Sequence, residues 1–176
     1  MPNASGGLTY DRLREAGIVL PDPPPPTANF DIHVQEGSLI FLSGQGPQDQ
    51  AGEYCTGKVG AEVPIENAHA HARLIGIGLL AVLHAALGDL GGVKRILKLL
   101  GMVDAAPDSA AHPQVIDGCS ELFVQLFGEA GRHARSAVGL QLAAPKYHGR
   151  ERGGGGGDRV NPDASESRAS RASVGA

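Results

Sequence analysis

The sequence contains no tryptophan, and its three tyrosines and four phenylalanines amount to only 4% of the 176 residues. Proteins that bind single-stranded nucleic acid stack the bases on aromatic side chains, so this shortage argues against such a surface. Only two cysteines are present, Cys55 and Cys119, which is too few for the disulfide scaffold of a small secreted domain. We expect two unpaired thiols in a reducing compartment; the alternative is one disulfide between them.

The sequence also shows neither the pattern of a targeting segment nor that of a membrane-spanning segment. The first ten residues contain neither the basic segment nor the apolar run of a secretory signal. The most apolar stretch, residues 74–87, is shorter than the roughly 20 residues of a membrane span and is interrupted by Gly76, Gly78 and His84. These absences predict a cytoplasmic protein with no membrane partner.

Glycine and charge are distributed unevenly along the chain. Residues 146–176 hold seven of the 26 glycines, with six basic and four acidic residues and few apolar ones. Such a segment cannot bury enough apolar surface to offset its ordering entropy, so we expect a disordered tail. Residues 1–145 carry nine basic and fifteen acidic residues, an acidic balance that argues against nucleic-acid binding. We expect an N-terminal helix and proline-rich connector in 1–29, one domain in 30–145, and the tail in 146–176.

The N-terminal half predicts a short helix and then a hairpin. Thr9 can cap a helix over Tyr10–Ala16 that Gly17 ends, and the prolines at 21–26 form a stiff connector. Phe30, Ile32 and Val34 alternate with polar residues, and the apolar run at 39–43 follows a Glu-Gly turn. We therefore expect two antiparallel strands, with a further short strand at 54–59.

The C-terminal half predicts two long helices alternating with two strands. Apolar residues recur at spacings of three and four over 65–87 and over 113–127, and a glycine follows each segment. The segment 134–142 is a predicted strand. Residues 93–103 fit a helix or a strand, and the glycines at 91, 92 and 101 favour the strand. The expected fold is α+β, a mixed sheet with two helices packed on one face.

Two short motifs, in this order of elements, resemble a known family. Ser-Gly-Gln-Gly-Pro at 43–47 is similar to the S-G-Q-x-P loop of the RidA/YjgF family, also called the endoribonuclease L-PSP or translation-inhibitor family. His-Ala-Arg-Ser-Ala-Val at 133–138 is similar to its P-A-R-S-x-V strand. The resemblance covers roughly residues 13–142 and is nearest to the subfamily with a longer N-terminus.

The resemblance implies a fold, an assembly and an activity. Such proteins have the chorismate-mutase-like fold and form homotrimers with a cleft between each pair of subunits. Their best-known activity is the hydrolysis of reactive enamines and imines, released by pyridoxal-phosphate enzymes, to 2-oxo acids and ammonia. The RidA-like protein itself needs no cofactor and no metal. The implied function is a 2-iminobutanoate/2-iminopropanoate deaminase-like hydrolase whose substrate is a small carboxylate.

The matching positions supply the candidate substrate-binding residues. Arg135 stands at the motif arginine, and its planar guanidinium suits a two-pronged grip on a carboxylate; without the motif, pairing with an acidic neighbour would be the expectation. Ser136 follows Arg135 and offers a hydroxyl or backbone contact, or is an ordinary strand serine. Ser43, Gly44 and Gln45 match the loop that lines the cleft with backbone groups. Phe30 stands where many members have a tyrosine, so it keeps an apolar wall but lacks the hydroxyl.

The end of the chain departs from the family. Members finish with a strand of alternating apolar and glutamate residues, and one of those glutamates is implied to activate the attacking water. Here Leu142 is followed by Ala-Ala-Pro and then by the glycine-rich tail, so the final strand and its catalytic glutamate are not found. The gene read in a shifted frame and a natural tail both explain the composition.

This departure keeps a second function open. A trimeric small-molecule-binding or regulatory protein without activity is the alternative to the deaminase. His69 and His71 on the long predicted helix do not suggest a metal site, because residues two apart point to different sides of a helix. RNA cleavage is disfavoured because the domain is acidic and no acid–base histidine pair is evident in the sequence.

Overall fold

The computed structural model of the chain describes residues 4–25, 29–49 and 51–140. The chain divides into two units, 1–143 and 144–176, and all described residues belong to the first. The predictions of a disordered tail over 146–176 and of a missing final strand after Leu142 concern residues outside the described ranges. They remain predictions.

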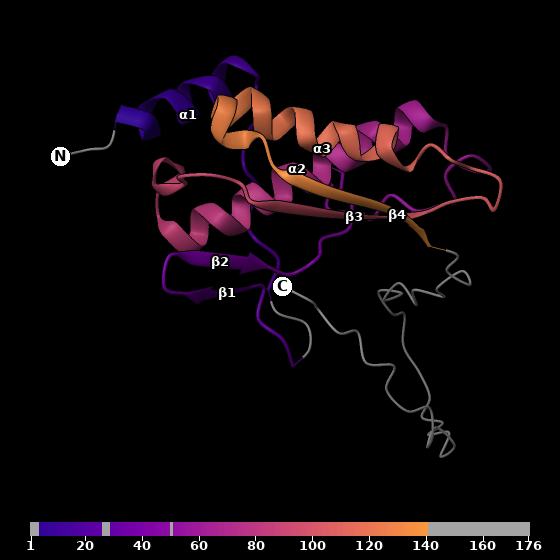
Figure 1. Cartoon of the computed structure of the whole chain (residues 1–176), viewed down its shortest axis with the longest axis horizontal. Coiled ribbons are helices and arrows are strands. Elements are labelled where there is room, and N and C mark those ends of the chain that lie inside the picture. The colour runs from indigo at the N-terminus through magenta and orange to yellow at the C-terminus, as the bar shows by residue number, and fades with distance from the viewer. Residues whose placement is uncertain (1–3, 26–28, 50, 141–176) are drawn as a thin grey trace, which may run out of the picture. The chain divides into compact units, whose positions relative to one another are not determined.

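Three helices and four strands form the described unit, which is the α+β composition predicted from the sequence (Figure 1). Two short 3-10 helices, η1 and η2, follow α2 and α3. The elements in chain order are α1 (Ala4–Glu15), β1 (His33–Glu36), β2 (Leu39–Leu42), α2 (Ile65–Leu87), η1 (Leu90–Gly92), β3 (Lys98–Asp104), α3 (His112–Phe127), η2 (Gly128–Gly131) and β4 (Ala134–Leu140).

The predicted hairpin is confirmed. Strands β1 and β2 are antiparallel, with Val34 opposite Phe41, and Gly37 takes a positive φ of 57° in the turn between them. Ile40 and Leu42 are half-buried and pack against the core, whereas Val34 and Phe41 are exposed on the other face. The hairpin contacts helix α2 and leaves its outer face open.

The other two strands form a parallel pair joined by a helix. β3 pairs with β4 in parallel, with Lys98 opposite Ala134 and Asp104 opposite Leu140, and α3 is the crossover connection between them. The prediction of one mixed sheet is therefore wrong for the described residues, which contain two separate two-stranded sheets. Alternation along each strand identifies strands and their faces, but it does not determine which strands share an edge.

Glycines on the strands let α3 lie close to the parallel pair. A Cβ atom at Gly101 of β3 would collide with Ile116, and one at Gly139 of β4 would collide with His112. Because Asp117 of α3 lies beside Arg135, at the other end of β4, the helix runs antiparallel to the strands. Figure 1 shows α3 running along the β3–β4 pair.

The core lies mainly between α2 and α3. The two helices are close enough that a Cβ at Gly118 would collide with the carbonyl oxygen of His69, and one at Gly76 would lie 2.8 Å from Leu122. The bounds predicted for both helices are confirmed to within one residue, and Gly88 ends α2 in the left-handed conformation. The largest fully buried side chains are Leu80, Leu90, Leu122, Leu126 and Val82.

Helix α1 is longer than predicted and is fixed by its aromatic residue. It begins at Ala4 rather than at Tyr10. The Tyr10 hydroxyl lies 2.8 Å from Nδ1 of His84 and accepts a hydrogen bond of 3.2 Å from the backbone N–H of Leu90. These contacts, buried Leu13 and a 2.8 Å hydrogen bond from Nη1 of Arg12 to the carbonyl oxygen of Leu126 dock α1 on η1 and α3 and on His84 of α2.

Two predicted strands differ from the structure. β3 begins at Lys98 instead of residue 93, because the backbone of Ile96 and Leu97 hydrogen-bonds to Ala130 and Ala134 around η2. The short strand expected over 54–59 is wrong, since this stretch makes only isolated bridges at its two ends, Tyr54 and Val59. Residues 93–97 and 54–59 both contain apolar side chains, but their backbones do not form the regular hydrogen-bond ladder of a strand pair.

Helix α2 is, by length and composition alone, apolar enough to cross a membrane, which the sequence reading did not expect. This is weak evidence, because a core helix of a globular domain meets the same criterion. Here α2 packs against α3, and its buried side includes Ala68, Ala72 and the run Leu80–Leu83.

Cys55 is half-buried and Cys119 is buried; both are free, as predicted.

Candidate functional site

Arg135, the predicted carboxylate-binding residue, lies near the start of β4 with its side chain towards α3. Its Nη1 donates to Oδ1 of Asp117 over 2.6 Å and to Oγ of Ser120 over 3.2 Å. The Arg135 side chain is 27% exposed and that of Asp117 is 44% exposed. Nε and Nη2 of Arg135 make no hydrogen bond to another described residue. The guanidinium is therefore held along one edge and available along the other.

Ser136 points to the opposite face of the parallel pair. Successive side chains on a strand alternate between faces, and Ser136 accepts a 2.8 Å hydrogen bond from Nζ of Lys98 on the face away from α3. The side chains of Arg135 and Ser136 cannot both contact the same small ligand on one side of the sheet. A shared site would have to use the backbone of Ser136.

The predicted loop and Phe30 come together at the end of the hairpin. Oγ of Ser43 donates to the carbonyl oxygen of Asp31 over 2.6 Å, and the Ser43 N–H donates to that of Ile32 over 3.0 Å. These bonds fix the start of the Gly44–Gln45 loop beside the segment that carries Phe30. Phe30 itself is 50% exposed, as a residue that lines an open cleft would be.

The two halves of the predicted site are separate within this chain. Among the described elements, the hairpin contacts α2, whereas β4 contacts β3 and α3. Neither β1 nor β2 contacts β3 or β4. No described contact between elements brings the hairpin that lies between Phe30 and the Ser43–Gln45 loop to the strand of Arg135.

Three polar residues lie near Arg135; Ser120 falls loosely at a position where the family has an asparagine, His133 belongs to the motif, and Asp117 was not predicted. Asp117, Ser120 and His133 surround the guanidinium or its hydrogen-bond partners. Asp117 and Ser120 are three residues apart, a spacing that puts both on one side of α3. That spacing was a usable signal, but only the antiparallel course of α3 over β4 brings the pair to Arg135.

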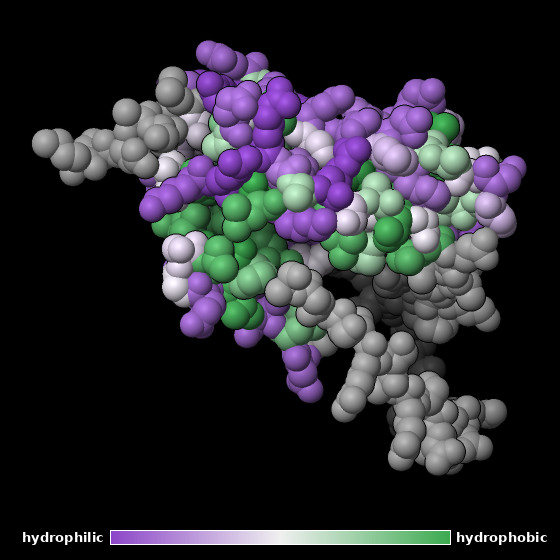
Figure 2. Space-filling view, in the orientation of Figure 1, coloured by the Kyte–Doolittle hydropathy of each residue, from purple (hydrophilic) through white to green (hydrophobic). Residues whose placement is uncertain are grey.

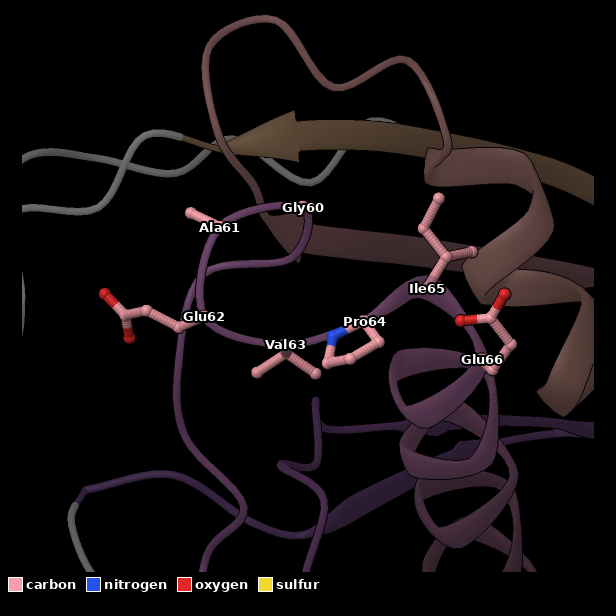
Figure 3. A pocket seen from close by; sticks show the side chains of 7 residues that line it. All are labelled: Gly60, Ala61, Glu62, Val63, Pro64, Ile65 and Glu66. Atoms are coloured by element: carbon pink, nitrogen blue, oxygen red, sulfur yellow. The ribbon is translucent and has the colours of Figure 1, made fainter.

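One hollow of about 360 Å³ opens at the beginning of α2. Its lining residues all come from one stretch, 60–66, which includes no predicted site residue. The carboxylates of Glu62 and Glu66 point away from each other (Figure 3), so they do not form an acid–base pair or a chelating pair. Within the described ranges, no three His, Cys, Asp or Glu residues are grouped to hold a metal ion.

Apolar side chains are exposed on the outer faces of both small sheets. On the parallel pair, Leu100 and Met102 are 56% and 57% exposed, and Val138 lies opposite Met102. On the hairpin, Val34 and Phe41 form an exposed cross-strand pair. Figure 2 shows hydrophobic residues gathered in patches on the face in view. Contiguous exposed apolar side chains are typical of interaction surfaces.

Comparison with known proteins gives consistent results. Residues 10–142 match the family described as "YjgF/chorismate_mutase-like, putative endoribonuclease". Protein TCP17 of Trypanosoma cruzi is 36% identical over 141 residues, which cover 80% of this chain and 88% of that protein.

Two crystal structures are similar over most of their length. The protein Atu1372 of Agrobacterium tumefaciens, of unknown function, is 37% identical with a TM-score of 0.71, covering 78% of this chain and 85% of that one. A Shewanella oneidensis MR-1 protein described as a "putative endoribonuclease" is 32% identical with a TM-score of 0.73, covering 76% and 89%.

Proposed function

Because the chain belongs to the YjgF/chorismate-mutase-like family, we propose that it hydrolyses small reactive 2-imino or enamine acids to 2-oxo acids and ammonia. The observation that carries this proposal is the arrangement of Arg135. A guanidinium anchored along one edge by Asp117 and Ser120 presents its Nε–Nη2 edge, and that edge matches the two oxygens of a carboxylate.

The proposal includes a homotrimer. It is supported by the lack of a described contact between the hairpin that leads to the Ser43–Gln45 loop and the strand of Arg135, because a neighbouring subunit would complete a cleft that uses both. The exposed apolar residues on the outer faces of both sheets supply a surface that association would remove from water. In this arrangement Phe30 is the apolar wall of the cleft and Arg135 holds the substrate carboxylate.

The enzymatic proposal is tested by supplying short-lived imino acids in situ with an amino-acid oxidase and following their disappearance. Arg135→Ala should reduce kcat/KM by about 100-fold, because it removes a charge-assisted, two-point contact. Arg132→Ala is the matched control, since Arg132 is exposed and pairs only with Glu129, and should behave as wild type. If wild type and Arg135→Ala both give the uncatalysed rate, the protein is not this enzyme.

The alternative is a binding or regulatory protein with the same carboxylate site. It is favoured by one observation, the ion pair of Asp117 with Arg135, since the cation is already partly neutralised. A 2-oxo acid that raises the melting temperature of wild type but not of Arg135→Ala, with no hydrolysis in either, would select this alternative.

The trimer is tested by sedimentation equilibrium. Met102→Lys places a charge in the exposed apolar face and should convert trimer to monomer. Val19→Lys is the control, because Val19 is 87% exposed and lies outside both sheets, so the trimer should survive. A wild-type protein that sediments as a monomer at micromolar concentration would contradict the proposed assembly.

A further inference from the structure

A serine and a histidine form a hydrogen-bonded pair beside Arg135. Oγ of Ser120 on α3 lies 3.2 Å from Nε2 of His133, the residue that leads from η2 into β4. The other ring nitrogen, Nδ1, lies 2.7 Å from the carbonyl oxygen of Gly131. Both side chains are half-buried. A hydroxyl next to a base that a third group orients is an arrangement suited to proton transfer.

The partners determine which group donates in each hydrogen bond of the series that links Gly131, His133, Ser120 and Arg135. A carbonyl oxygen only accepts, so Nδ1 of His133 carries the proton and Nε2 has a lone pair. The Ser120 hydroxyl therefore donates to Nε2. Arg135 can only donate, so its Nη1 uses one of the two lone pairs on Oγ of Ser120. The second lone pair is not taken by any described residue.

The histidine ring is held in place by its surroundings. Gly131 lies so close to the backbone of Phe123 that a Cβ atom would collide with its carbonyl oxygen, which fixes the acceptor of Nδ1. The Phe123 ring meets the His133 ring edge to face, with centroids 5.9 Å apart. The imidazole can thus neither tilt away from Ser120 nor exchange its two nitrogens without breaking these contacts.

We propose that Ser120 and His133 form the proton relay that activates the attacking water in the hydrolysis proposed above. The inference rests on that proposed function. The pair supplies, from the described residues, the base that the family resemblance places at a C-terminal glutamate. The relay requires that a water molecule donating to the remaining lone pair of Ser120, on the Nη1 side of Arg135, reach the imine carbon of a substrate whose carboxylate is held by the Nε–Nη2 edge.

The proposed step balances in atoms and charge. The water oxygen bonds to the imine carbon while one water proton passes to Oγ of Ser120. The Ser120 proton passes at the same time to Nε2 of His133, which becomes an imidazolium. The imine nitrogen takes up a proton from solvent, which gives a neutral carbinolamine beside the His133 imidazolium. His133 then returns its Nε2 proton through Ser120 to the amino nitrogen, the C–N bond breaks to release ammonia, and the hydroxyl proton leaves to solvent as the carbonyl of the 2-oxo acid forms.

Asp117 has a positioning part in this scheme. Its Oδ1 is bound to the Arg135 cation, and a carboxylate that neutralises a guanidinium is a weaker proton acceptor than an uncharged imidazole. Asp117 instead holds Nη1 of Arg135 in the position where Nη1 also donates to Oγ of Ser120. Removing its charge should affect substrate affinity more than the chemical step.

The decisive variants keep the fold and remove the base. His133→Asn retains a donor towards Gly131 but lacks Nε2, and Ser120→Ala interrupts the relay. For each we expect kcat to fall by about 100-fold, within the usual range for a lost general base, while KM stays within about twofold. His71→Gln, on α2, is the matched histidine control and should keep the wild-type kcat.

Two further readouts separate chemistry from structure. Added imidazole should restore part of the kcat of His133→Asn in proportion to its concentration, which a structural role would not allow. A 2-oxo acid should raise the melting temperature of His133→Asn as much as that of wild type, whereas Arg135→Ala should show no shift.

The outcomes are distinct. If His133→Asn keeps the wild-type kcat, or loses it without imidazole rescue, the relay is wrong although the deaminase proposal stands. If Asp117→Asn loses kcat while His133→Asn does not, Asp117 is the base and the relay is again overturned. If wild type itself does not exceed the uncatalysed rate, the deaminase proposal fails and the relay fails with it.

Discussion

The carboxylate of Asp117 lies 2.6 Å from Nη1 of Arg135, so the residue identified as a carboxylate holder already binds one carboxylate of its own chain. The pairing with an acidic neighbour, one of the two interpretations that the sequence left open, is therefore confirmed, and the binding of a substrate carboxylate stays a prediction. The internal pair uses one edge of the guanidinium and leaves the other edge for a ligand.

Asp117→Asn should increase the affinity for a small 2-oxo acid several-fold, because it removes the charge that partly neutralises Arg135. The pair is partly exposed, so its loss should lower the free energy of unfolding by no more than about 1 kcal/mol. Isothermal titration calorimetry at low and high salt measures the first effect. Glu129→Gln breaks an exposed arginine pair on η2 and should leave the affinity unchanged; equal gains in both variants would refute the assignment.

Gly118→Ala should destabilise the protein by about 1–3 kcal/mol, because the added methyl group meets the backbone of α2 at His69. Gly78→Ala is the matched helical variant, since nothing lies within 4 Å of its Cβ position, and it should stabilise by about 0.5–1 kcal/mol. Urea unfolding followed by circular dichroism compares the two. Similar effects of the same sign would mean that the helices do not approach at Gly118.

Tyr10→Phe should loosen α1 without disturbing α2 and α3. The hydroxyl bonds to His84 and accepts from the Leu90 N–H, so its removal should cost about 1–2 kcal/mol of local stability. Hydrogen exchange read by mass spectrometry should show faster exchange in α1 and η1. Unchanged exchange in α1 would show that Leu13 and the hydrogen bond from Arg12 to Leu126 dock this helix without the tyrosine hydroxyl.

Cys119 should resist alkylation at pH 9 while Cys55 reacts. Burial raises the pKa of the Cys119 thiol to about 12, so the folded protein holds it as the unreactive thiol. The folded state then binds more protons than the unfolded state between pH 9 and 12, so this group's contribution to stability falls as pH rises there. Cys119→Ala should lack that part of the slope, and labelling of both thiols in urea is the control.

Most of the elements could be predicted because their signals are local. The ends of α2 and α3 follow from apolar spacing and from Gly88 and Gly128, and the hairpin follows from alternation around a turn glycine. β3 was predicted too early because residues 93–97 are apolar enough for a strand, yet their backbone is bound around η2. Which strands share a sheet depends on contacts between distant residues, and the mixed sheet was for that reason mispredicted.

The site could be predicted only in part for the same reason. The motif identified Arg135, but its partners Asp117 and Ser120 are 18 and 15 residues away and come near only through the course of α3. Strand alternation, applied strictly, would have predicted that Arg135 and Ser136 point to opposite faces. His133 was read merely as part of the motif, because its bond to Gly131 depends on the tight packing of η2.

The close packing of α3 on Gly101 and Gly139 also determines the order in which we expect the parts of the protein to unfold. A sheet of two strands is marginal by itself, so β3 and β4 depend on the helix that covers them. Loss of α3 would expose both strands at once, and we expect the three elements to open as one cooperative unit. The hairpin, which contacts α2 instead, should open independently and at lower denaturant concentration.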